Sequence, residues 1–169
     1  MGFGWYYAGV PKEPRWTDYP ARAELHAIYA EVDALLAPYS CEGSVECCDF
    51  AITGREPLPT TVELVEVLHA AKAIGGLPKK RLPLVKDSRR CAFLSDENRC
   101  RIYASRPFGC RTYFCHRIVG PGKLPRAEIQ ALSRRVTALA ERAFPRDPLP
   151  RPLMRSLGQE LREVIARSK

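Results

Sequence analysis

The sequence has no apolar run that approaches the roughly 20 residues needed to span a bilayer. Residues 1–16 lack the basic region, apolar run and small-residue cleavage site of a secretory signal. Tyr6 also stands where N-myristoylation requires serine or threonine. These absences predict a soluble, cytoplasmic protein with no membrane partner. With 169 residues the chain can bury a core of its own, so we expect residues 1–169 to form a single domain.

Motifs of the common enzyme classes are also missing. There is no Gly-rich phosphate loop, paired-carboxylate motif or recognisable S-adenosylmethionine site. Cys100 and Arg106 have the spacing of a phosphatase loop, but the segment lacks the glycines of such a loop and places Pro107 after the arginine. His116 follows Cys115 directly, and adjacent side chains seldom face each other, which disfavours a Cys–His nucleophile. His116 could instead bind a metal or lie at the surface. No catalytic residue is assigned, and whether the chain is an enzyme stays open.

What the sequence does contain is a dense group of cysteines. Seven lie between residues 41 and 115, and none of them forms a C-x-x-C pair. The odd number argues against a complete disulfide framework, and disulfides are rare in a reducing cytosol. Clustering also disfavours their use as scattered packing residues. The candidate metal ligands are Cys41, Cys47, Cys48, Cys91, Cys100, Cys110 and Cys115.

The spacing of these cysteines predicts a metal without choosing it. Structural zinc sites usually offer two close C-x2–4-C pairs, and only Cys110 and Cys115 fall within that range. Cys47 and Cys48 are expected to diverge in extended backbone, so one tetrahedral ion would rarely use both. A centre with several irons, or two separate sites, would accommodate them better. This reasoning favours an iron–sulfur cluster or iron, with zinc as the alternative.

Charge is uneven along the chain. Nearly all of the net charge of +8 lies in residues 117–169, which hold 12 Lys and Arg against 5 Asp and Glu. Such a basic region could attract an acidic protein partner or nucleic acid, or could be a solvated helix face. No sequence-reading motif accompanies the charge, so nucleic acid is the less favoured partner.

Periodicity predicts helices near residues 20–37, 61–74 and 126–144, and a fourth after the Pro-rich turn of residues 145–152. Pro20 suits an early helical position, Thr60 and Glu63 can form a capping box, and Gly75 and Gly76 can end the second helix. The expected apolar stripes are Leu25, Ile28, Val32 and Leu35; Leu64, Leu68, Ala71 and Ile74; Ile129, Leu132, Val136 and Leu139; Leu153, Leu157, Leu161 and Ile165.

Between the second and third helices the pattern changes. Residues 91–103 predict two short strands joined by the polar turn 95–99. Short segments with so little apolar content need a staple, and metal–thiolate bonds are one. We therefore expect a mainly α fold with a small irregular β/loop centre (α+β), in which about four helices surround a metal-stapled cysteine-rich core.

One run is specific enough to suggest a family. It reads C-x-I-Y-x-x-R-P-x-x-C-R-x-Y over residues 100–113, after "CAFL" at 91–94 and after Cys47-Cys48 followed by "ITGRE" at 52–56. These motifs resemble the YkgJ-type cysteine-cluster family, whose members are described as zinc- or iron-chelating proteins. Flagellin lysine N-methylases carry a related cluster. The resemblance covers about residues 41–117.

The resemblance implies that the seven cysteines are the metal ligands. Nearby arginines would offset the negative charge of the thiolates and donate hydrogen bonds to sulfur, with Arg106 and Arg111 as the candidates. One position departs from the family pattern C-x2-C-x2-C-C, because Ser44 stands where the second cysteine is expected. A hydroxyl is a poor replacement for a thiolate.

Three functional hypotheses follow. The first is a small metal-binding protein that holds zinc, iron or an iron–sulfur cluster in a core of residues 41–117, beside a basic C-terminal helical hairpin of residues 118–169. The second is a redox or methyl-transfer enzyme, or an accessory protein, that uses the cluster. The third is a metal-stapled module whose basic helices bind an acidic partner or RNA.

Overall fold

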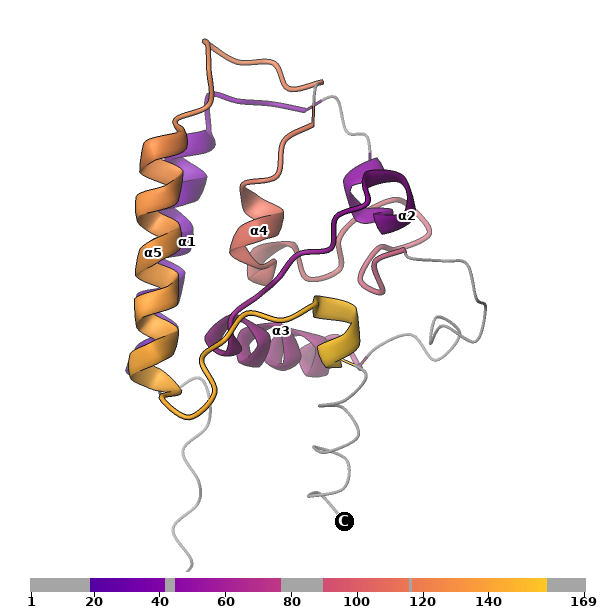
Figure 1. The fold of residues 1–169 in the computed structure, drawn as a ribbon. Coiled ribbons are helices and arrows are strands. Elements are labelled where there is room, and N and C mark those ends of the chain that lie inside the picture. The colour runs from indigo at the N-terminus through magenta and orange to yellow at the C-terminus, as the bar shows by residue number, and fades with distance from the viewer. Residues whose placement is uncertain (1–18, 42–44, 77–89, 116, 158–169) are drawn as a thin grey trace, which may run out of the picture.

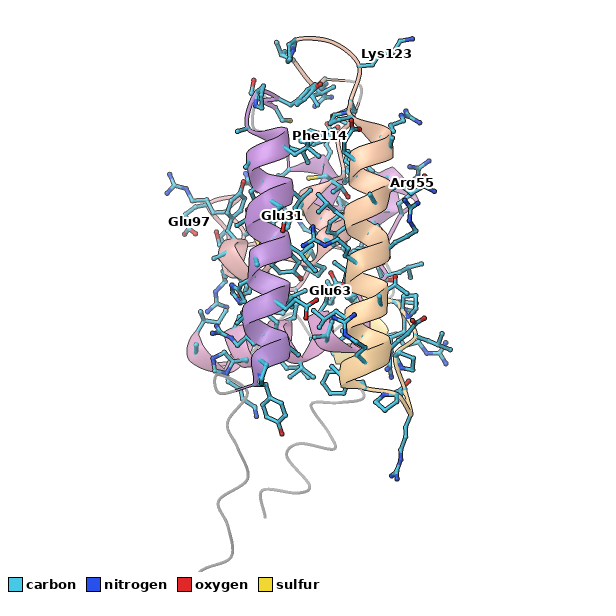
Figure 2. The ribbon with its side chains drawn as sticks, turned by 90° about the vertical axis from the view of Figure 1, so that its left-hand side faces the viewer. Glu31, Arg55, Glu63, Glu97, Phe114 and Lys123 are labelled. Atoms are coloured by element: carbon cyan, nitrogen blue, oxygen red, sulfur yellow. The ribbon has the colours of Figure 1, made fainter. Side chains whose placement is uncertain are left out.

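Two long helices form one side of the molecule. In the computed structural model, which describes residues 19–41, 45–76, 90–115 and 117–157, α1 (Pro20–Leu36) and α5 (Arg126–Ala143) run antiparallel, side by side (Figures 1 and 2). Both helices lie within one residue of their predicted bounds, and Pro20 does occupy the first turn of α1. Their facing apolar stripes form the first core cluster. Its buried members from these helices are Leu25, Ile28, Tyr29, Val32, Leu36, Leu132, Val136, Leu139 and Ala140.

Helix α3 (Thr61–Ala73) runs across the pair beside its lower half and joins it to the rest of the molecule (Figure 1). Glu63 reaches back to accept a hydrogen bond from the Thr60 backbone N–H at 2.8 Å, as the predicted capping box requires. Beyond the helix, Gly75 and Gly76 both have positive φ, 85° and 88°, which ends the helical path at little steric cost. Because Val62 faces the first cluster and Leu64 the second, α3 is buried on more than one side.

The second core cluster lies under the cysteine-rich part of the chain. Phe50, Leu64, Val67, Phe93 and Ile102 are among its buried members. Cys91 is buried with them, and Cys48 and Cys100 pack against the cluster. The cysteine region therefore has an apolar floor, to which α3 contributes Leu64, Val67 and Ala71.

The prediction of two strands in residues 91–103 is wrong. The turn forms as expected, with the Ser95 N–H bonded to the Arg99 carbonyl at 2.8 Å, but the flanks make only one isolated bridge, between Leu94 and Cys100. Ala92, Phe93 and Leu94 are buried consecutively, whereas a half-buried strand alternates. The chain curls around its apolar side chains, because a two-stranded ribbon has little stability of its own.

The helix predicted after the Pro-rich turn begins at residue 153 and is described to residue 157. Leu153 and Leu157 are buried in the second cluster, and the Leu153 N–H donates to the Pro57 carbonyl at 3.2 Å. Leu161 and Ile165 of the predicted stripe lie outside the described residues, so the hairpin of residues 118–169 stays a prediction. The fold is thus mostly helical with little strand. No helix in the described ranges is long and apolar enough to cross a membrane.

Candidate metal centre

Two cysteine-bearing segments that are far apart in the sequence meet through their backbones. Cys47 and Cys48 lie in the 3-10 turn η2 (Glu46–Cys48), directly before the short helix α2 (Phe50–Thr53). The Cys91 N–H donates to the Cys48 carbonyl at 2.8 Å, and Asp49 and Arg90 form an antiparallel bridge beside it. Asp49 also caps α2 by accepting from the Ala51 N–H at 3.1 Å. These contacts fix the position of the Cys47-Cys48 turn relative to Cys91.

The next two cysteines follow on a folded loop. Cys100 is held by its bridge to Leu94, and the Arg101 N–H donates to the Phe93 carbonyl at 2.8 Å. The chain then passes through the 3-10 turn η4 (Tyr103–Ser105) to the one-turn helix α4 (Phe108–Arg111), which carries Cys110. Pro107 precedes α4 with extended backbone, which suits its fixed φ.

Burial is the main effect that raises the pKa of the thiols of Cys91, Cys100 and Cys110. Burial raises the pKa of Cys91 to about 11, with a further rise from the charge of Cys100. Burial also raises the pKa of Cys110 to about 12, and the charges of Cys91 and Cys100 add to this. The pKa of Cys100 is raised as well, first by burial. Without a cation, these three thiols would therefore stay protonated at neutral pH.

Cys47 and Cys48 complete the group. Their sulfurs lie 3.9 Å apart, within hydrogen-bond distance for sulfur. This hydrogen bond is the main cause that lowers the pKa of Cys47 to about 6. The pKa of Cys48 is raised, first by the same bond and then by burial and the charges of Cys47, Cys91 and Cys110. We call these five cysteines (Cys47, Cys48, Cys91, Cys100 and Cys110) the five-thiol group.

The expectation that Cys47 and Cys48 diverge is wrong, because their backbone turns instead of extending. Two thiolates on one tetrahedral ion, each at about 2.3 Å from it, lie about 3.8 Å apart. The observed 3.9 Å between the two sulfurs matches that spacing. Both side chains can therefore reach the same ion, and the reason for preferring a multi-iron centre no longer holds.

Arg106 is the cation that acts on this group. Its charge lowers the pKa of Cys47, Cys100 and Cys110 in opposition to the larger effect of burial on the last two. The guanidinium lies 3.9 Å over the Tyr103 ring and 3.7 Å from Asp33. Its Nε is buried and has no hydrogen-bond partner among the described residues. A metal-bound sulfur would be a suitable acceptor for that N–H.

Arg111 is directed to α1. Its guanidinium is buried, pairs with Asp33 and stacks 4.0 Å over the Tyr29 ring. It also donates to the Ala104 carbonyl and, at 3.0 Å, to the Arg106 carbonyl. These contacts hold the η4–α4 segment against the layer formed by α1 and α5. Its predicted role beside the thiolates stays a prediction.

The backbone around Cys41 and Cys115 makes other contacts. Cys41 is exposed, and Ser40 before it pairs with Val119 through two backbone hydrogen bonds of 2.8 and 2.9 Å. Cys115 is partly buried, and its carbonyl accepts from the Ile118 N–H at 3.3 Å. Ser44 and His116 lie outside the described residues.

Two buried carboxylates on α3 were not predicted as part of the site. Glu63 Oε1 accepts from the Phe108 N–H at 2.7 Å, at the start of the turn that carries Cys110, and from the Tyr29 hydroxyl at 3.2 Å. Glu66 is fully buried and accepts from the Ser105 hydroxyl at 2.8 Å and from Arg22 at 2.9 Å. His26 Nε2 also lies 2.9 Å from Glu66 Oε1, but it is not aligned for a hydrogen bond. The only sequence signal was that Glu63 could form a capping box.

The donor set suits a soft or borderline cation in its chemistry. Several sulfurs, an offsetting arginine and an apolar floor are what a thiolate site for zinc or iron requires. Within the described ranges, no three Cys, His, Asp or Glu side chains are arranged so that they could hold an ion. Metal binding would therefore need these thiols to draw together, a coupling that is common in thiolate sites.

Comparison with known proteins agrees with this chemistry. The family model described as "CxxCxxCC: Putative zinc- or iron-chelating domain" matches residues 40–134. The match covers more than half of the chain and includes all seven cysteines. Searches of curated proteins and of solved structures give no match.

Proposed function

We propose that this chain, which belongs to the CxxCxxCC family of zinc- or iron-chelating domains, holds one zinc or iron ion with the thiolates of Cys48, Cys91, Cys100 and Cys110. The observation that carries the proposal is the backbone hydrogen bond of 2.8 Å from Cys91 to Cys48. It joins two cysteine blocks that are separated by residues 49–90 in the sequence. A fold seldom gathers sulfurs from distant segments around a shared centre for packing alone.

The choice of these four thiols follows from burial and mutual charge. Cys91 is buried and Cys48, Cys100 and Cys110 are partly buried, so an ion among them would be shielded from water. The charges of Cys91 and Cys110 act on Cys48, and those of Cys91 and Cys100 act on Cys110. Four thiolates satisfy the tetrahedral coordination of a closed structural zinc site.

Charge balance also supports the proposal. Four thiolates around a divalent ion leave about two negative charges, which need compensation in a partly buried site. Arg106 supplies one positive charge at the centre. Its unpaired Nε provides a donor for a metal-bound sulfur.

Among the described residues, the pocket beside α1 does not support the enzymatic alternative. This pocket of about 240 Å³ is lined by His26, Asp33, Tyr103 and Arg111 together with Tyr29, Ala30 and Ala104. This is smaller than the roughly 300–1,000 Å³ of typical small-molecule sites. Its main charges, those of Asp33 and Arg111, are already paired with each other.

Metal content tests the proposal directly. Protein purified without oxygen should contain close to one zinc or iron per chain by elemental mass spectrometry. Serine at Cys91, Cys100 or Cys110 should remove most of that metal, because a hydroxyl is a poor ligand for either ion. The matched controls are Cys41→Ser and Cys115→Ser, which should keep it. A wild-type chain that stays metal-free after anaerobic reconstitution, with all seven thiols reactive, would contradict the proposal.

A further inference from the structure

The five-thiol group has one sulfur more than a tetrahedral ion needs. Four of its members are buried or partly buried, whereas Cys47 is exposed. Closed tetrahedral sites use four ligands, and a fifth coordination position opens only when ligands enter or leave. Cys47 therefore differs from the other four in its access to solvent.

The position of Cys47 is also fixed relative to the ion site. It lies 3.9 Å, sulfur to sulfur, from Cys48, and both belong to the same turn η2. The preceding residue of this turn, Glu46, forms an exposed ion pair with Arg117 at 3.2 Å. Backbone contacts hold the inner side of the turn against Cys91, and the outer side faces solvent. An ion held by Cys48 would thus be within reach of Cys47 without any movement of the backbone.

We propose that Cys47 is the exchange ligand through which this site passes its metal ion to, or receives it from, a thiol-bearing partner. The proposal rests on the metal site proposed above. In this proposal the site transfers a thiophilic metal ion as well as holding it. The partner is defined by its chemistry: it must offer two or more thiolates.

The exchange step involves ligand substitution and no redox chemistry. The Cys47 thiol gives its proton to the Cys48 sulfur, so the Cys47 sulfur forms a bond to the ion while the bond from Cys48 breaks. A thiol of the partner then loses a proton, bonds to the ion on its exposed side and displaces a further cysteine of the chain, which is protonated in turn. Each new metal–sulfur bond replaces one that breaks, so charge and electrons balance. The short distance between Cys47 and Cys48 allows the first exchange because both sulfurs can contact one ion.

The transfer rate tests this role. Wild type and Cys47→Ser are loaded with one zinc ion per chain, and zinc is withdrawn by 2,3-dimercaptopropanol, a small dithiol. We expect Cys47→Ser to keep one zinc per chain but to release it at least tenfold more slowly than wild type. Cys115→Ser, a matched loss of another thiol, should release zinc at the wild-type rate.

A second measurement needs no variant. In the zinc-loaded wild type, maleimide labelling followed by peptide mapping should modify Cys47 well before Cys48, Cys91, Cys100 and Cys110. Labelling of all five at one rate would overturn the proposal. So would a Cys47→Ser chain that loses its zinc, which would make Cys47 a resident ligand, or one that releases zinc at the wild-type rate. If wild type binds no zinc or iron at all, the proposed metal site itself fails, which is a distinct result.

Discussion

In the layer formed by α1 and α5, Leu25, Ile28, Val32 and Ala140 are completely buried, whereas residues 90–115 contain no regular element longer than four residues. The first region has the continuous apolar contact that stabilises amphipathic helices in water. The second has short turns, isolated bridges and partly buried thiols. From this difference we predict that the helical layer holds its own shape, whereas the cysteine region depends on what its side chains bind.

Helix α3 and its two acids connect these regions. Glu63 bonds to Tyr29 of α1 and to the backbone at the start of α4, and Glu66 bonds to Arg22 of α1 and to Ser105 of η4. The same two carboxylates thus accept hydrogen bonds from the helical layer and from the cysteine region. A buried carboxylate is tolerated only where such donors replace its lost hydration, so each acid depends on correct placement of both regions.

The largest expected effect comes from removing one ligand of the cysteine region. In Cys110→Ala we expect the metal to be lost, together with binding free energy on the order of 10 kcal/mol for a structural zinc site. Amides in residues 90–115 should then exchange rapidly with solvent while far-ultraviolet circular dichroism keeps most of the helical signal. Hydrogen exchange read by mass spectrometry measures this region by region.

The matched change in the helical layer is Leu139→Ala, at a nearly fully buried position of α5. It should lower the free energy of unfolding by about 2–5 kcal/mol because it leaves a cavity. Metal content and protection of residues 90–115 should be retained below the melting transition. If Cys110→Ala leaves both metal content and amide hydrogen exchange unchanged, the cysteine region depends on metal no more than the helical layer does.

An intermediate effect is expected at the connection between the regions. Glu63→Gln puts an amide NH2 group where one carboxylate oxygen now accepts hydrogen bonds, so one set of buried donors loses its acceptor. This should cost about 1–3 kcal/mol of stability. Zinc affinity should also fall several-fold, since the Phe108 N–H that Glu63 holds begins the turn of Cys110. Denaturant titration and competition with a chelator measure the two effects.

The control for this change is Glu31→Gln, on the exposed face of α1, which should leave zinc affinity at the wild-type value (Figure 2). A Glu63→Gln chain with lowered stability and unchanged zinc affinity would show that α4 presents Cys110 without help from α3.

The sequence predicted the helical layer much better than the cysteine region. The bounds of α1, α3 and α5 were correct within about one residue because Leu25, Ile28 and Val32, and their counterparts, repeat with the helical period. The same reasoning failed for residues 91–103, where the fold depends on Phe93 and Leu94 entering an apolar cluster to which α3 contributes. The local sequence pattern of residues 91–103 cannot show that this cluster packs against them.

Long-range pairing also limited prediction of the site. Glu66 was not singled out in the sequence, and Arg111 was predicted beside the thiolates. Both are buried because their partners, Arg22 and Asp33, come from α1. The gathering of Cys48 and Cys91 could be expected from the metal chemistry of clustered cysteines. Which thiols lie inside and which faces solvent followed only from the turn η2 and its contacts.

The smallest expected effect concerns the surface charge of the helical layer. Arg135 and Arg142 of α5 pair with Glu31 and Glu24 of α1, so part of the basic charge is compensated within the molecule. The hydrogen bond from Arg135 lowers the pKa of Glu31 below its usual value. A carboxyl with a lowered folded-state pKa stabilises the fold at neutral pH and loses this contribution as pH falls through that pKa.

Arg135→Ala should therefore lower the thermal midpoint only slightly at neutral pH and low salt, with metal content unchanged. The difference from wild type should vanish in 1 M salt and at pH values well below about 4, because salt screens an exposed pair and acid neutralises Glu31. Thermal melts of both proteins at several pH values and salt concentrations measure this difference in midpoint. A large loss of midpoint that persists in high salt would show that Arg135 contributes through packing instead.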